Sequence, residues 1–217
     1  MSLSVELAVR ERLLATAHAM SAAGLNTGTA GNVSVRIDGG MLITPSGMPP
    51  VACTPEDMVI VTADGSASGR VAPSSEWRFH HDLYTRRPEV GAILHAHAPF
   101  ATSLACQRIE IPPFHYMIAR FGGNTVRCAR YATFGTQALS DNILAAMDGR
   151  SACLMANHGM LVSGRDLDNA LDLAIEFETL CEQYWRTRQI GEPVLLSDAE
   201  MAEVVERFRW YGKPRAG

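Results

Sequence analysis

Residues 33–43, VSVRIDGGMLI, decide which kind of sheet this chain forms. Apolar and polar side chains alternate from Val33 to Ile37, as expected for a strand with one buried face. Asp38-Gly39-Gly40 supplies the small residues of a tight turn, and Met41-Leu42-Ile43 continues as a second strand. Strands joined by so short a turn are antiparallel, because parallel strands need a long crossover connection.

The same patterns extend outward from this hairpin. Strand-like segments occur at 58–61, 90–98, 125–128 and 153–155, and a single helical turn is expected at 54–57. Helical spacing is found at 5–22, 74–87, 99–106, 136–147, 166–189 and 197–209. Helices interleaved with hairpin-joined strands favour a mixed or largely antiparallel sheet covered by helices over a doubly wound parallel sheet. No repeat or linker divides the chain, so we expect one domain over residues 1–217.

Composition narrows the functional classes. The chain has 217 residues, 47% of them hydrophobic, which is enough for one sizeable core. Its formal net charge of −4 and scattered basic residues indicate neither a nucleic-acid nor a membrane partner, so a small molecule is expected. Charged residues near the amino terminus argue against a signal peptide, and the five cysteines lack C-x-x-C spacing. We therefore expect a cytoplasmic protein with reduced thiols.

The segment Leu94-His95-Ala96-His97 predicts a metal site. Residues two apart in a strand point to the same face, so both imidazoles are able to reach one ion. His158 follows the apolar run 152–155 and is the preferred third ligand. Three neutral imidazoles leave a catalytic ion its charge and an open position, and zinc is the expected occupant. The alternative is that these are hydrogen-bonded core histidines, which is the interpretation given to His18, His80, His81 and His115.

Glu76 opens the helix predicted over 74–87, with Ser74 or Ser75 as its N-cap. A glutamate in the first turn stabilises the helix dipole, and that is one interpretation. The other is catalysis, because this helix leads directly into the strand that carries His95 and His97.

Two loops are rich in small hydroxylated residues and glycine. They are residues 26–32, NTGTAGN, and 44–47, TPSG. Each is compatible with an ordinary turn, but together with Ser74-Ser75 they make three segments whose N–H and hydroxyl groups suit a phosphate. A phosphorylated ligand is therefore expected.

Five segments in order resemble the class II aldolase and adducin-head family. They are residues 24–34, 43–47, 73–80, 95–97 and 157–159, which read GLNTGTAGNVS, ITPSG, PSSEWRFH, HAH and NHG. The likeness also includes residues 115–118 and 131–136 and extends from about residue 8 to Gly212. It implies a three-layer α/β/α sandwich with a mainly antiparallel central sheet, a mobile carboxyl-terminal tail from about residue 207, and a homotetramer with active sites between subunits.

The resemblance also implies roles for individual residues. His95, His97 and His158 would bind one zinc ion per subunit, with Glu76 as a fourth contact and as the acid/base. Tyr116, from a neighbouring subunit, and Tyr211, on the tail, would face the aldehyde half of the substrate. The residues expected around the phosphate are Thr29, Asn32, Ser46, Gly47, Ser74 and Ser75.

The activity implied is reversible cleavage of a ketose 1-phosphate similar to L-fuculose 1-phosphate, giving dihydroxyacetone phosphate and an aldehyde. A salvage aldolase acting on 5-deoxyribulose or 5-methylthioribulose 1-phosphate is an open alternative, and so is a sugar-phosphate decarboxylase. Glu76 disfavours an epimerase, for which the resemblance would place aspartate there. An adducin-like interaction module is disfavoured because the metal ligands are present.

Overall fold

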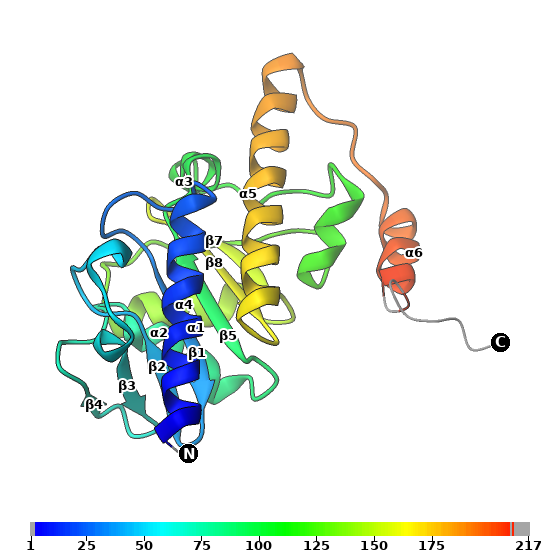
Figure 1. Cartoon of the computed structure of the whole chain (residues 1–217). Coiled ribbons are helices and arrows are strands. Elements are labelled where there is room, and N and C mark those ends of the chain that lie inside the picture. Colours follow the sequence, from blue (N-terminus) through cyan, green and yellow to red (C-terminus); the bar gives the residue numbers. More distant parts are fainter. Residues whose placement is uncertain (1–2, 209, 211–217) are drawn as a thin grey trace.

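A computed structural model describes residues 3–208 and 210 (Figure 1). Within these residues the strands form one eight-stranded sheet in the order β4-β3-β2-β1-β5-β8-β7-β6. All neighbours are antiparallel except β6 and β7. The mixed, mainly antiparallel sheet is therefore confirmed. The strands are β1 (Asn32–Ile37), β2 (Gly40–Ile43), β3 (Val59–Thr62), β4 (Ala67–Ser68), β5 (Ala92–Ala96), β6 (Cys128–Ala129), β7 (Ala152–Met155) and β8 (Gly159–Gly164).

Helices cover both faces of this sheet and make the predicted three-layer sandwich. The α-helices are α1 (Leu3–Ala22), α2 (Trp77–Arg86), α3 (Pro99–Cys106), α4 (Gln137–Ala146), α5 (Leu167–Ile190) and α6 (Asp198–Phe208). Short 3-10 helices are η1 (Pro50–Ala52), η2 (Pro55–Asp57) and η3 (Tyr116–Phe121). In Figure 1, α6 stands apart from the sheet at the carboxyl-terminal side of the molecule. None of the helices in the described part of the chain is long and apolar enough to cross a membrane.

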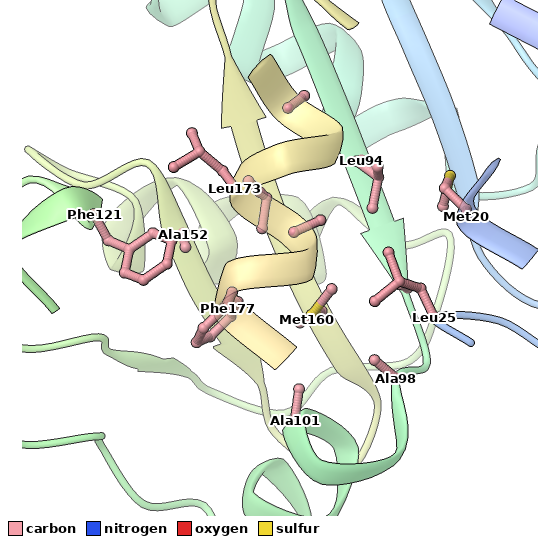
Figure 2. Close-up of a cluster of buried hydrophobic side chains, with 14 of the residues drawn as sticks. Met20, Leu25, Leu94, Ala98, Ala101, Phe121, Ala152, Met160, Leu173 and Phe177 are labelled. Carbon is pink, nitrogen blue, oxygen red and sulfur yellow. The ribbon is translucent and has the colours of Figure 1, made fainter. Parts of the chain in front are cut away.

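One core lies between the sheet and helices α1, α3 and α5. Leu94 of β5 and Met160 of β8 pack there with Phe177 of α5, and all three are fully buried or nearly so (Figure 2). Alanines such as Ala101 of α3 let that helix approach closely, while apolar burial supplies the main stabilising free energy.

A second core lies on the opposite face, under α2 and α4. Ile93 and Leu161 from the sheet pack with Phe79 of α2 and Ile143 of α4. Because side chains alternate along a strand, Leu94 points into the first core while Ile93 and His95 point towards the α2 side. The face that carries α2 is therefore the face on which His95 lies.

The sequence patterns missed four elements, β8, β4, η1 and η3, of which β8 matters most. β8 follows β7 after a three-residue connection in which Asn157 adopts the left-handed conformation, with φ of 53°. That turn joins β7 and β8 into a tight hairpin, where the sequence pattern predicts only the end of a strand. The short strand β4 and the 3-10 helices η1 and η3 were also not predicted, because none of them has enough residues to show a period.

The largest difference from the predicted helix boundaries lies at the start of α2. Helix α2 begins at Trp77, and its N-cap is Glu76, so neither Ser74 nor Ser75 caps it as predicted. Helix α6 is regular up to Phe208, so Arg207 and Phe208 belong to this helix. The tail beyond this point lies almost entirely outside the described residues.

Candidate functional site

Two backbone features bring three histidines together at one end of the central strands β5 and β8. β5 places His95, which is fully buried, at its carboxyl end, and His97 follows one residue after the strand ends. The β7–β8 turn places His158 beside them. Gly159 makes this approach possible, because a Cβ there would lie 2.4 Å from the main-chain oxygen of Ala96.

The imidazole nitrogens converge as metal ligands do. One ring nitrogen of each of the three histidines lies within 4.8 Å of the others, and Nε2 of His95 is 3.1 Å from Nε2 of His97. Four ligands placed tetrahedrally around zinc at about 2.0 Å are separated by roughly 3.3 Å. The spacing observed therefore suits a small divalent ion at the centre of the cluster.

Glu76 closes the fourth side of this cluster. It is 8% exposed, with Oε2 lying 3.2 Å from Nε2 of His95 and Oε1 lying 3.1 Å from Nε2 of His158. Burial raises the pKa of Glu76, but the adjacent His95 and His158 outweigh it and hold the pKa well below its usual value. Apart from this contact with His158, the buried Oε1 has no hydrogen-bond partner among the described residues, as expected of an oxygen placed to contact a metal or a reacting proton.

The pKa of His97 supports a neutral ligand set. Burial, followed by the neighbouring His95 and His158, lowers the pKa of His97 to about 4. A neutral imidazole has a free lone pair to coordinate a metal. The three histidines and Glu76 therefore fit a catalytic divalent cation in both geometry and charge.

A pocket of about 350 Å³ opens beside the histidine cluster. Its lining includes Glu76, His97 and His158 together with all six residues predicted to surround a phosphate, which are Thr29, Asn32, Ser46, Gly47, Ser74 and Ser75. Gly47 adopts the left-handed conformation, with φ of 67°, which turns this loop back at the pocket wall. The structure thus brings the three predicted hydroxyl-rich segments to one cavity.

Two of these six side chains are already engaged within the protein. Ser74 Oγ accepts a hydrogen bond from the main-chain N–H of Glu76 at 3.3 Å. The amide of Asn32 lies between Glu76 and His80, with Nδ2 3.1 Å from Oε2 of Glu76 and Oδ1 2.6 Å from Nε2 of His80. These contacts connect the phosphate loops directly to Glu76.

Of the two predicted tyrosines, Tyr116 lies outside this pocket, and Tyr211 is not among the described residues. Tyr116, on η3, is 49% exposed and stacks on Phe208 of α6 with ring centroids 6.4 Å apart. It is absent from the pocket lining.

Sequence reasoning missed the aromatic side of the pocket and the partner of Asn32. Tyr131 and Phe134, which are 55% and 64% exposed, line the pocket with Ala132. Their segment contributed to the family likeness but carried no residue type that indicates a role. His80 was given an ordinary core role beside His81, although its position four residues after Glu76 on the same helix face was a usable signal.

Comparisons with known proteins show the family of this chain. Residues 11–185 match the model of the class II aldolase and adducin N-terminal domain. The chain is 53% identical over 206 residues to the 5-methylthioribulose-1-phosphate/5-deoxyribulose-1-phosphate aldolase of Rhodospirillum rubrum, covering 95% of this chain and 93% of that one. It is 45% identical over 202 residues to the L-fuculose phosphate aldolase of Escherichia coli, covering 93% and 94%.

A solved structure supports the same assignment. An L-fuculose 1-phosphate aldolase superposes with a TM-score of 0.90 at 39% identity, covering 96% of this chain and 98% of that one. The family match covers most of the chain, and the histidine cluster suits the metal dependence typical of these enzymes. The chain belongs to the class II aldolase and adducin N-terminal domain family, and within it is a metal-dependent aldolase.

Proposed function

We propose that this aldolase reversibly cleaves a ketose 1-phosphate to dihydroxyacetone phosphate and an aldehyde, with zinc at His95, His97 and His158. The observation that carries the proposal is one pocket lined by His97 and His158 of the metal cluster, by Glu76 and by the hydroxyl-rich loops. A substrate phosphate bound at these loops would bring the neighbouring carbons of the substrate close to Glu76. The ion would supply a Lewis acid that stabilises the enediolate left by cleavage.

Glu76 is the proposed acid/base. In cleavage the C3–C4 bond breaks, its electron pair stays on the C3 fragment, and the C4 hydroxyl gives its proton to solvent water as C4 becomes the aldehyde carbon, while the carboxylate of Glu76 takes up one proton from the solvent. Glu76 then delivers a proton to C3, and in synthesis it removes that proton. Its burial and its place beside the pocket support this role, since a base must lie within hydrogen-bond reach of the proton it moves.

The phosphate is proposed to bind Thr29, Asn32, Ser46, Gly47, Ser74 and Ser75, all of which line the pocket. Tyr116 and Tyr211 are proposed to reach the aldehyde end from a neighbouring subunit of a homotetramer. The exposed position of Tyr116 outside its own pocket is compatible with that arrangement. We also propose that the protein is one domain and acts in the cytoplasm.

For the aldehyde half we propose 5-methylthioribulose 1-phosphate or 5-deoxyribulose 1-phosphate as the substrate. The support is the 53% identity to an aldolase named for both compounds. The apolar groups of Tyr131, Ala132 and Phe134 also suit a methyl or methylthio end. L-fuculose 1-phosphate is the second candidate, because of the 45% identity to an L-fuculose phosphate aldolase.

A substrate panel tests this proposal. The zinc-loaded protein is incubated with 5-methylthioribulose, 5-deoxyribulose and L-fuculose 1-phosphates, and release of dihydroxyacetone phosphate is measured. We expect the largest kcat/KM for one of the first two. No release from any of the three would overturn the aldolase reaction proposed, and the greatest efficiency with L-fuculose 1-phosphate would overturn the substrate choice.

A further inference from the structure

A row of buried polar side chains leads from Glu76 into the body of the protein. Asn32 contacts Oε2 of Glu76 at 3.1 Å, and His80 Nε2 contacts Asn32 Oδ1 at 2.6 Å. On the other edge of the ring, His80 Nδ1 lies 2.7 Å from Ser34 Oγ, which lies 3.0 Å from the hydroxyl of Tyr84. His80 and Ser34 are completely buried, and Asn32 and Tyr84 are each 5% exposed.

The donor and acceptor of each hydrogen bond follow from the ionised Glu76 at one end of the row. An ionised Glu76 only accepts, so Asn32 turns its NH2 group to Glu76 and its oxygen to His80. His80 must then carry its proton on Nε2, which leaves Nδ1 to accept from the hydroxyl of Ser34. Ser34 in turn accepts from the hydroxyl of Tyr84. All four bonds therefore point towards Glu76.

The neutral state of His80 supports this order. Burial, and to a smaller extent the nearby His95, lowers the pKa of His80 to about 3. A neutral ring has one donor and one acceptor, which is what Asn32 and Ser34 require. Phe79 further restrains the ring, because it stacks on His80 with centroids 4.7 Å apart.

Only two elements supply the row, and their packing sets its geometry. Asn32 and Ser34 are two apart on β1, so they share the face that meets α2. His80 and Tyr84 are four apart on α2, so they share the face that meets β1. Arg36, next on the same face of β1, hydrogen-bonds the main-chain oxygens of Tyr84 and Arg87 and fixes the far end of the helix.

We propose that Asn32, His80 and Ser34 are positioning residues that hold Oε2 of Glu76, so that Oε1 alone is free to exchange a proton with C3 of the substrate. The proposal rests on the acid/base role proposed for Glu76. With Oε2 held by the N–H of Asn32, a proton taken from C3 binds Oε1 and returns from Oε1, and the electron pair of the C–H bond stays on the substrate. His80 touches neither pocket nor metal cluster and acts through Asn32.

A neutral row suits this task better than an arginine or lysine would. A cation beside Glu76 would form an ion pair with the carboxylate and weaken it as a base. Asn32 and His80 orient the same oxygen without adding charge. Partners of this kind around metal-site residues typically change activity by about 10- to 100-fold when they are removed.

The test compares His80→Leu with His80→Gln, since glutamine keeps one donor and one acceptor and leucine keeps neither. Ser140→Ala is the matched control. Ser140 of α4 is also fully buried, and its hydroxyl donates to Asp82 of α2, the helix that carries His80, away from Glu76. For each variant kcat and KM for cleavage, metal content, thermal unfolding and solvent-deuterium incorporation into dihydroxyacetone phosphate are measured.

We expect His80→Leu to lower kcat and deuterium incorporation by at least ~10-fold, with KM and metal content nearly unchanged. His80→Gln should recover much of this loss, and Ser140→Ala should retain kcat even where its unfolding temperature falls equally. Unchanged kcat in His80→Leu, or an equal loss in Ser140→Ala, would overturn the proposal. If His80→Leu does not fold, Ser34→Ala is measured against Ser140→Ala with the same criteria.

Crystal structures separate this proposal from the proposed function. If the wild-type protein cleaves no substrate in the panel, the proposed function fails. The orientation of Glu76 in wild type and in His80→Leu still tests whether the row of polar side chains positions Glu76. We expect Oε2 of Glu76 to leave Asn32 in the variant. Oε2 remaining at its wild-type distance from Asn32 would overturn the positioning role.

Discussion

Nδ1 of His95 contacts the main-chain oxygen of Met160 at 2.9 Å across the β5–β8 pair. A carbonyl oxygen only accepts, so Nδ1 of His95 carries the proton, and the lone pair of Nε2 points to His97 and Glu76. The main-chain carbonyl of Met160 on the neighbouring strand thus sets the tautomer of His95 that metal binding requires. The metal centre consequently depends on the register of two central strands as well as on the histidines themselves.

Glu76→Gln should abolish turnover while the metal stays bound. Glutamine keeps the shape of the side chain but cannot take up or return a proton, and three histidines remain as ligands. We expect kcat to fall by at least ~100-fold. Steady-state kinetics and metal analysis check this, with the exposed Glu89→Gln as the control. A Glu76→Gln enzyme of normal kcat would remove Glu76 from the acid/base role.

Removing the metal should remove activity reversibly. A chelator is expected to abolish cleavage, and added zinc should restore it, because the described residues that line the pocket include no lysine or arginine to stabilise an enediolate. His97→Ala should weaken metal binding more than it weakens folding, since His97 is exposed to the pocket although its ring is partly desolvated within the cluster. Metal titrations of wild type and variant measure the difference. Full activity in the chelated wild-type protein would contradict the metal mechanism.

The buried His80 should make stability depend on pH in mildly acidic solution. Its pKa is about 3 in the folded protein, with burial as the main cause, and about 6.5 in the unfolded chain. Between these values the unfolded state binds one more proton, so the contribution of His80 is complete above about pH 6.5 and is lost as pH falls towards 3. The free energy of unfolding should then fall by up to ~1.4 kcal/mol per pH unit from this group.

Urea unfolding of the metal-free protein between pH 4 and 8 measures this slope. The variant His80→Gln does not titrate, so its slope should be shallower than that of wild type by the contribution of His80. Parallel curves for the two proteins would show that folding does not lower the pKa of His80.

Ser75→Ala should weaken binding of the phosphate group. Ser75 is exposed in the pocket and, unlike Ser74, forms no hydrogen bond with Glu76 within the described part of the chain, so its loss should act on KM and leave kcat nearly unchanged. A hydrogen bond to a charged group implies an increase of roughly 10-fold or more in KM. Competition by inorganic phosphate gives an independent measure, and the exposed Ser103→Ala serves as control. An unaltered KM and phosphate inhibition would exclude Ser75 from the phosphate site.

The sequence by itself determined the hairpin at residues 33–43, the mainly antiparallel sheet, and the shared face of His95 and His97. Each of these follows from local periodicity or turn chemistry, which acts over a few neighbouring residues. The sequence also marked Glu76 and the hydroxyl-rich loops, all of which line one pocket with His97 and His158.

Only the tertiary structure decided how these parts meet. β8 and the left-handed conformation of Asn157 place His158 beside His95. No periodic pattern of residues in the sequence predicts a turn of that shape. The row from Tyr84 to Glu76 likewise exists only because α2 packs across β1. Such contacts depend on strand register and helix packing, which are set by burial of the whole core, so a local reading of His80 or Asn32 does not reveal them.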